Sequence, residues 1–276
     1  MTLYLKLKMK DLLTNLEILG WGIVFIEFWV LMWLFVFSKG APAQTEWDVY
    51  VVNINAAMAY SFLGLLSMAA VAISLAYSIF YTSRAARYLT KFTRASPATL
   101  MVEDFVASLA AIIIIVAVII FSVIGCTYMK WGVIPHVENP AAVFVDLVLG
   151  GVALYWLAYM LALVLVVTRR TRALSMMSFV PLILAFIAYA QLWVDFGNLV
   201  YVIPLSTIPA LLVYHSTGAI PPTGSYLWWL GGGELLQAVN LKLAAVSLFA
   251  WIFIFAGVSL ILLRKSRGVP IEELRF

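Results

Sequence analysis

The sequence predicts an all-α polytopic membrane protein with six transmembrane helices, and three observations lead to this fold class. First, 65% of the 276 residues are hydrophobic and only 11% are charged, whereas a soluble domain carries about 25% charged residues. Second, the high mean hydropathy of +1.06 is concentrated in six long apolar runs. Third, the basic residues fall almost entirely on one side of these runs. We therefore expect one transmembrane domain over residues 1–276.

Residues 3–15 are expected to form an interfacial helix ahead of the first span. Apolar residues are interspersed there with Lys6, Lys8, Lys10 and Asp11. Such a segment suits a helix at the membrane surface whose lysines face anionic headgroups. In the alternative interpretation, these lysines only orient the first span.

Each of the six apolar runs is long enough to cross the membrane as a helix. A hydrocarbon core about 30 Å thick needs about 20 residues at 1.5 Å per residue. Helices are favoured over barrel strands because the runs are continuously apolar and do not alternate. The predicted spans are residues 16–37, 56–81, 105–128, 141–167, 173–193 and 244–263.

The distribution of positive charge predicts that both termini are cytoplasmic. All of the 17 Lys+Arg except Lys39, Lys130 and Lys242 precede the first span, follow the last, or lie in the loops after spans 2 and 4. An excess of Lys and Arg marks the cytoplasmic loops of membrane proteins. We expect a multi-pass protein of the cytoplasmic membrane with the lipid bilayer as its main surroundings.

The longest predicted cytoplasmic segment between spans covers residues 82–104. Its basic residues recur three or four positions apart, so on a helix they share one face. Ser96 is a good helix cap, and Pro97 follows where proline is tolerated at the first helical position. We expect span 2 to run into the cytoplasm, turn at residues 95–97 and continue through a short helix into span 3. The alternative is a solvated basic loop that only fixes the topology. The basic residues are Arg84, Arg87, Lys91 and Arg94.

Residues 194–239, between spans 5 and 6, form a long apolar segment interrupted by prolines and glycines. Residues 199–214 are too apolar for an aqueous loop, yet Pro204 and Pro209 make them a poor full span. Broken apolar segments at membrane depth are tolerated where they pack against protein or line a cavity. We expect re-entrant or short helices near the outer leaflet. A seventh, kinked span is the alternative, but it would place the basic C-terminus outside.

The sequence carries no motif for nucleotide binding or catalysis. Neither a GxxxxGK[ST] loop nor HExxH nor GxSxG occurs. His136 and His215 are too few for a bis-His dihaem site, and the single Cys126 excludes a disulfide framework and a Cys-rich zinc site. We therefore expect no enzyme activity, no catalytic residue, no metal and no cofactor in this chain. The net charge of +4 gives no reason to expect nucleic-acid binding.

Polar residues within the predicted spans are candidates for a substrate path. Glu27 stands near mid-bilayer in span 1, and Asp146 lies in the outer part of span 4. A charged residue at the bilayer centre costs about 2.5–3.5 kcal/mol on insertion scales, so it rarely faces lipid. These acids either line a translocation path or subunit interface, or serve packing alone. Trp29, in the aromatic span 1, and Gln191, at the outer end of span 5, are the other candidates.

The order of these segments resembles the permease subunits of type-2 ATP-binding cassette (ABC) exporters, particularly the compact archaeal versions. NLEILGWGIVFIEFWVLMWLFVF and the helix before it look like the elbow helix and first span of that family. ARYLTKFTRASPATLMVEDFVAS is similar to its coupling region, and IPLSTIPALLVYHSTGAIPPTGSYLWWLGG to its outer re-entrant helices. LLRKSRG resembles the basic tail of many members.

The resemblance implies a dimer of two permeases, identical or homologous, each docked onto a separate cytoplasmic ABC ATPase. ATP and Mg²⁺ would be bound by that ATPase. The substrate would be apolar or amphipathic and would pass between the two permeases. The residues that would couple this chain to the ATPase are Arg94, Ala95, Ser96, Pro97, Ala98, Thr99, Leu100, Glu103 and Asp104.

Two other kinds of protein remain open at this point. One is a non-transporting membrane subunit of a larger respiratory, secretion or DNA-transfer complex. The other is a stand-alone secondary carrier or membrane enzyme, which predicts paired polar residues at mid-bilayer in two repeated halves. Only Glu27 lies at that depth and no clear internal repeat is visible, which counts against the carrier.

Overall fold

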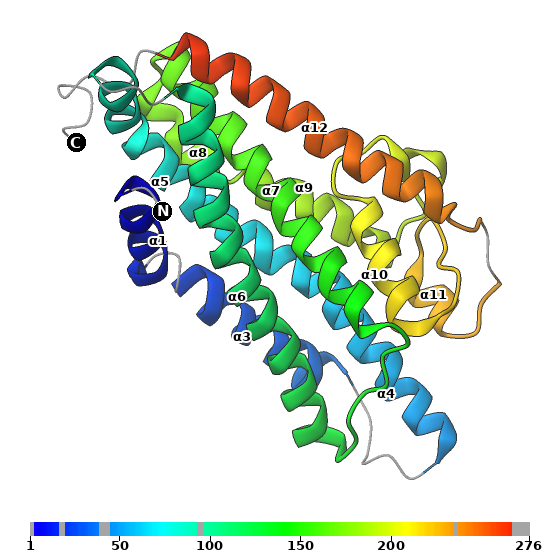
Figure 1. The fold of residues 1–276 in the computed structure, drawn as a ribbon. Helices are drawn as coiled ribbons and strands as arrows, with labels where there is room; N and C mark the ends of the chain where they lie inside the picture. The colour runs from blue at the N-terminus through cyan, green and yellow to red at the C-terminus, as the bar shows by residue number, and fades with distance from the viewer. Residues whose placement is uncertain (1–2, 17–19, 39–44, 93–95, 235–236, 267–276) are drawn as a thin grey trace.

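The structure is an elongated bundle of helices (Figure 1). This computed structural model describes residues 3–16, 20–38, 45–92, 96–234 and 237–266. Within these ranges the chain forms helices and no strand. Five helices in the described ranges are long and apolar enough to cross a membrane, which agrees with the predicted all-α polytopic membrane fold. They cover Glu46–Ser83, Pro97–Trp131, Pro140–Thr168, Thr171–Leu192 and Leu241–Lys265.

These five helices correspond to the second to sixth predicted spans. The first predicted span, residues 16–37, lies partly outside the described residues. Its described part comprises η1 (Gly20–Val24), α3 (Phe25–Leu31) and η2 (Met32–Phe37), where η1 and η2 have π-helical geometry. Because the apolar helix there is shorter than the five others, the total of six spans stays a prediction.

The second span begins ten residues earlier than the sequence predicts. It consists of α4 (Glu46–Met58), the π-helical η3 (Ala59–Leu63) and α5 (Gly64–Phe92). Thr45 caps α4, because its hydroxyl accepts a hydrogen bond from the Asp48 amide at 3.2 Å while the Asp48 carboxylate accepts one from the Thr45 amide at 2.9 Å. This reciprocal capping box stabilises a helix start in a stretch that is too polar to be recognised as a span.

The predicted short helix after residues 95–97 is not separate from span 3. Instead, α6 runs without a break from Pro97 to Trp131. Ser96 caps this helix as predicted, with its hydroxyl accepting a hydrogen bond from the Thr99 amide at 3.1 Å. Because no helix-breaking residue follows Pro97 until Gly125, nothing in the sequence interrupts the helix at the membrane surface.

The helix α7 (Pro140–Thr168) lies at the centre of the bundle. It is buried along most of its length and contacts α5, α6, α10 (Thr207–Thr217) and α12 (Leu241–Lys265). The fifth span is broken into η4 (Thr171–Ala173), α8 (Leu174–Ser178), α9 (Val180–Tyr189) and η5 (Ala190–Leu192). Pro181 stands near the start of α9, where a proline is tolerated.

Replacing Gly151 with alanine should destabilise the protein by about 1–3 kcal/mol, the usual cost of overpacking. A Cβ atom at this position of α7 would lie 2.6 Å from Cγ2 of Ile112 on α6. Equilibrium unfolding in mixed detergent micelles would measure this loss. Gly257→Ala is the matched control, because a Cβ atom there meets nothing within 4 Å. Equal stability of the two variants would contradict the close α6–α7 packing.

The segment before the last span forms short helices. These are η6 (Gly197–Tyr201), α10 and α11 (Tyr226–Leu230). With 11 residues, α10 is about 16 Å long at 1.5 Å per residue, which is too short to cross a core of about 30 Å. Its length favours the short-helix interpretation over a seventh span.

The ends of the helices that carry most basic residues gather at one end of the bundle. Figure 1 places α1 (Leu3–Thr14), the end of α5, the start of α6, α8 and the end of α12 together there. We call this the basic end, and the opposite end, near α4, α10 and α11 (Figure 1), the acidic end. Glu46 and Asp48 lie in the first turn of α4, and the Glu138 amide donates a hydrogen bond to the Ser216 carbonyl of α10. Assignment of the basic end to the cytoplasm stays a prediction.

Candidate functional site

A buried polar cluster joins three helices at the basic end. Lys8 of α1 forms an ion pair with Asp104 of α6, with Nζ and Oδ1 3.6 Å apart. The Tyr4 hydroxyl donates a hydrogen bond to the same carboxylate oxygen at 2.9 Å. Lys8 Nζ also donates to Ser78 Oγ at 2.9 Å and to Thr82 Oγ1 at 3.5 Å, both on α5. The side chains of Lys8 and Asp104 are only 4% and 7% exposed, so solvent hardly screens this pair.

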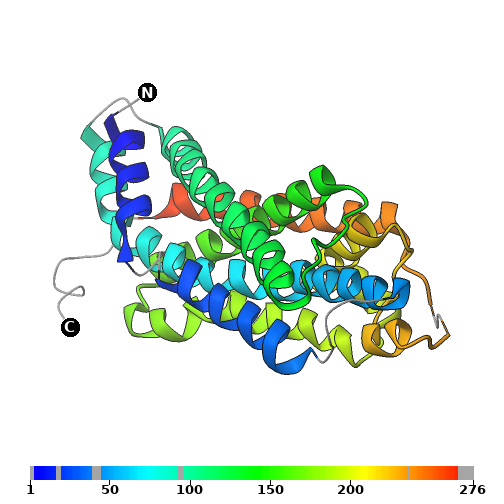
Figure 2. The ribbon, with the colours of Figure 1, turned by 90° about the horizontal axis from the view of Figure 1, so that it is seen from below.

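The spacing of residues on α1 explains how this cluster forms. Tyr4, Lys8 and Leu12 recur every four residues and therefore lie on one face of the helix. That face packs toward α5 and α6, and Figure 2 shows α1 lying between their ends. Burial and the Asp104 carboxylate raise the pKa of Tyr4, so its hydroxyl keeps its proton and remains a donor.

The expected orientation of Lys8 toward lipid headgroups is therefore wrong. The other two lysines of α1, Lys6 and Lys10, are exposed, as are the leucines Leu3 and Leu7. The exposed face of α1 thus keeps the mixed apolar and basic character of an interfacial helix, while Lys8 holds the helix to the bundle.

The structure divides the predicted coupling residues into exposed and buried sets. Ser96, Ala98 and Thr99 are exposed. Leu100 and Asp104 are buried against the bundle, so neither presents a surface to a partner, and the coupling role of this set stays a prediction. Pro97 and Glu103 are partly buried, and Arg94 and Ala95 lie outside the described residues.

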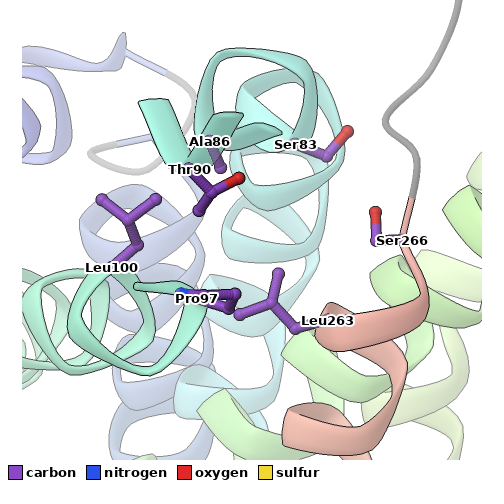
Figure 3. Close-up of a pocket in the computed structure, with 7 residues that line it drawn as sticks. All are labelled: Ser83, Ala86, Thr90, Pro97, Leu100, Leu263 and Ser266. Carbon is purple, nitrogen blue, oxygen red and sulfur yellow. The ribbon is translucent and has the colours of Figure 1, made fainter. Parts of the chain in front are cut away.

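A small pocket shows how the start of α6 is held in place. It has a volume of about 20 Å³ and lies between α5, α6 and the end of α12. Figure 3 shows Pro97 of α6 beside Leu263 of α12 on one side of this pocket. Ser83 and Thr90 of α5 line the opposite side. The pocket is large enough for about one water molecule, so the three helix ends are in near contact.

Two aromatic residues stand out on the exposed surface at the end of α5. Tyr88 and Phe92 are 54% and 68% exposed, and their rings stack with centroids 5.8 Å apart and planes 19° apart. Large stacked aromatic side chains on a rigid helix are typical anchors of protein interfaces. Tyr88 and Phe92 are not among the predicted coupling residues, although their spacing of four positions on a helix is visible in the sequence.

The four predicted substrate-path residues each contact a different part of the bundle. On α3, Glu27 accepts a hydrogen bond from Ser122 of α6, and Trp29 makes edge-to-face contacts with Phe25 and Phe28. Asp146 of α7 lies 2.6 Å from Nδ1 of His215 on α10. Gln191 of η5 donates a hydrogen bond to the Ser206 carbonyl at 2.9 Å. These contacts tie helices together, and a shared substrate path stays a prediction.

No model of a known protein family matches the sequence, and no curated protein matches it either. Across the described ranges, no group of three or more His, Cys, Asp or Glu side chains is arranged to hold a metal ion. The candidate site consists of the described ends of α5 and α6: the Lys8–Asp104 pair joins α6 to α1, and Tyr88 and Phe92 are exposed near the end of α5.

Proposed function

We propose that this chain is the permease subunit of an ATP-driven ABC exporter in the cytoplasmic membrane. It moves an apolar or amphipathic substrate, works with a second permease of the same or a homologous sequence, and receives its energy from a separate cytoplasmic ATPase. This proposal makes the basic end cytoplasmic, in agreement with the excess of Lys and Arg there.

The projection of α5 and α6 carries this proposal. The helix α5 continues to Phe92, eleven residues past the predicted membrane boundary at Tyr81, and α6 begins at Pro97, eight residues before the boundary at Phe105. At 1.5 Å per residue, the two helices extend about 16 Å and about 12 Å beyond the membrane core. They form a hairpin that continues directly into two membrane-spanning helices.

The clamp at the base of this hairpin supports a role in transmitting movement. Lys8 and Asp104 join it to α1, and Pro97 and Leu100 pack beside the end of α12. A movement imposed on the described ends of α5 and α6 would pass into the membrane domain, because each helix continues from there without a break into an apolar span. An ATPase that is not covalently linked to the membrane domain requires such a path, because it can move the spans only through a contact at their cytoplasmic ends.

The proposed contact surface for the ATPase differs from the sequence prediction. It consists of Tyr88 and Phe92 of α5 together with the exposed residues Ser96, Ala98 and Thr99 at the turn into α6. Leu100 and Asp104 are buried beneath this surface, where Asp104 pairs with Lys8 and Leu100 lies beside the end of α12. The exposed apolar faces of α6 and α12, for example at Phe121 and Phe253, remain for lipid or for the second permease.

Isolation of the chain from its native membrane in a gentle detergent, with partners identified by mass spectrometry, tests the proposal. We expect a soluble ATPase that carries a nucleotide-binding loop to be recovered with it, and ATP hydrolysis in the purified complex. Recovery of respiratory, secretion or DNA-transfer subunits without such an ATPase would overturn the proposal in favour of a non-transporting subunit.

A further inference from the structure

Three arginines lie close together in the turn between α7 and the helix that follows it, at the basic end of the bundle (Figure 1). The helix α7 ends at Thr168 and η4 begins at Thr171, so only two residues separate two helices that are each long and apolar enough to cross a membrane. We call residues 169–172 the arginine turn; its arginines are Arg169, Arg170 and Arg172. All three are exposed, and within the described ranges none of them takes part in an ion pair or a side-chain hydrogen bond.

The length of the following helix places the arginine turn at the membrane surface. Thr171–Leu192 comprises 22 residues, which extend about 33 Å at 1.5 Å per residue and only just exceed a hydrocarbon core of about 30 Å. This helix therefore has little length to spare outside the core. Its first turn lies at the level of the lipid head groups, where the three guanidinium groups meet phosphates.

The backbone of the turn indicates a use for the Arg169 side chain. Arg169 ends α7 in the left-handed conformation, with φ of 56° and ψ of 30°, and its amide donates a hydrogen bond to the Leu165 carbonyl. Helices commonly end on a left-handed residue, but glycine is usual there because a side chain disfavours this conformation. An arginine at this position bears a backbone cost that glycine would avoid, and such strain points to a function of the side chain.

An apolar face continues from the arginine turn into the membrane. Met176, Phe179 and Ile183 are 75%, 39% and 54% exposed, and their spacing of three and four positions places them on one side of α8 and α9. Arg172 precedes Met176 by four positions and therefore lies on the same side. The opposite side packs into the bundle, where Ala185 is fully buried. A lipid whose phosphate lies at the turn would have its acyl chain along this face.

We propose that the arginine turn binds the phosphate group of an anionic phospholipid, whose acyl chain packs along Met176, Phe179 and Ile183. Arginine guanidinium groups match phosphate oxygens with paired, charge-assisted hydrogen bonds. Three unpaired positive charges favour a head group with net negative charge over phosphatidylcholine, in which an ammonium group balances the phosphate. The site requires α7 and Thr171–Leu192 to span a membrane. It does not depend on the proposed transport function, since neither an ATPase nor a second permease contributes to it.

Photolabelling of the purified chain in phosphatidylcholine nanodiscs tests this site. The two probes are a phosphatidylglycerol and a phosphatidylcholine that carry the same diazirine group in one acyl chain, each added as a minor component, and the labelled residues are mapped by mass spectrometry. We expect the anionic probe to label residues 176–183 at least about tenfold more than the neutral probe, since each basic residue near the surface contributes about fivefold in affinity.

Substitution of the arginines should remove this preference. Arg172→Gln alone should lower it about fivefold, and Arg169→Gln/Arg170→Gln/Arg172→Gln should abolish it. Lysine at all three positions should retain most of the preference, because the positive charges remain.

Arg264→Gln/Lys265→Gln is the matched control, because it removes two exposed basic residues from the last turn of α12, at the same end of the bundle. Labelling of residues 176–183 should not change in this variant. The neutral probe shows whether each variant inserts like the unmodified chain, since its labelling does not depend on the arginine charges. If the triple variant inserts differently, Arg172→Gln alone decides the result.

Three outcomes would overturn the proposal. The first is equal labelling of the unmodified chain by both probes, and the second is an equal loss of preference in the α12 control. The third is an unchanged preference after Arg172→Gln or the triple glutamine substitution; if the triple variant then also fails to copurify with an ATPase, the arginines contact that protein and not a lipid.

Discussion

Asp104→Leu should destabilise the protein by about 3–5 kcal/mol, because it leaves the Lys8 ammonium buried without its counter-charge. The Lys8 side chain is 4% exposed, so water cannot replace the lost carboxylate without movement of α1. Ser78 and Thr82 hydroxyls accept hydrogen bonds from the ammonium group but carry no charge. Tyr4 would also lose the acceptor of its hydroxyl. Equilibrium unfolding in mixed detergent micelles measures the loss.

The double variant Lys8→Met/Asp104→Leu distinguishes an uncompensated charge from lost packing. Replacement of both members of a buried ion pair with apolar residues is often neutral or stabilising, so most of the lost stability should return. Lys10→Met is the control for removal of an exposed lysine from the same helix and should change stability little. A double variant as unstable as Asp104→Leu would contradict the ion-pair explanation.

The membrane fold was predictable because apolar length is a local property of the sequence. Five of the six predicted spans correspond to long apolar helices. The ends of the helices were harder to predict than their presence, because they depend on capping residues and not on hydropathy. The capping box of Thr45 and Asp48 begins α4 in a polar stretch. At the predicted membrane boundary near Phe105, α6 continues without a break, so no helix end marks the boundary.

The buried cluster could not be predicted, because it joins residues that are far apart in the chain. Lys8 and Asp104 are 96 positions apart, and each fits a simpler local interpretation: an interfacial lysine and an acidic residue on a surface loop. Only the packing of α1 between the ends of α5 and α6 brings them together. The hydrogen bond from the His136 amide to Asn53 Oδ1 likewise joins a loop to a helix far away in the sequence, and no sequence periodicity predicts such a contact.

Tyr88→Ala/Phe92→Ala should weaken association with the proposed ATPase by at least about 30-fold, since truncation of one interface hot spot costs about 2 kcal/mol or more. The two stacked rings are largely exposed, so the variant should insert and fold like the unmodified chain. Copurification of the ATPase, and stimulation of its ATP hydrolysis by the chain in nanodiscs, provide the measurement.

A matched aromatic pair shows whether this effect belongs to the hairpin. Phe121 and Tyr128 of α6 are 74% and 56% exposed but lie toward the opposite end of the bundle, so Phe121→Ala/Tyr128→Ala should retain the ATPase. If both double variants bind the ATPase equally well, the hairpin tip is not the contact surface. If both lose it, the loss comes from altered membrane insertion. Loss in the hairpin variant alone would make the exposed end of α5 the point at which ATP-driven movement enters the membrane domain.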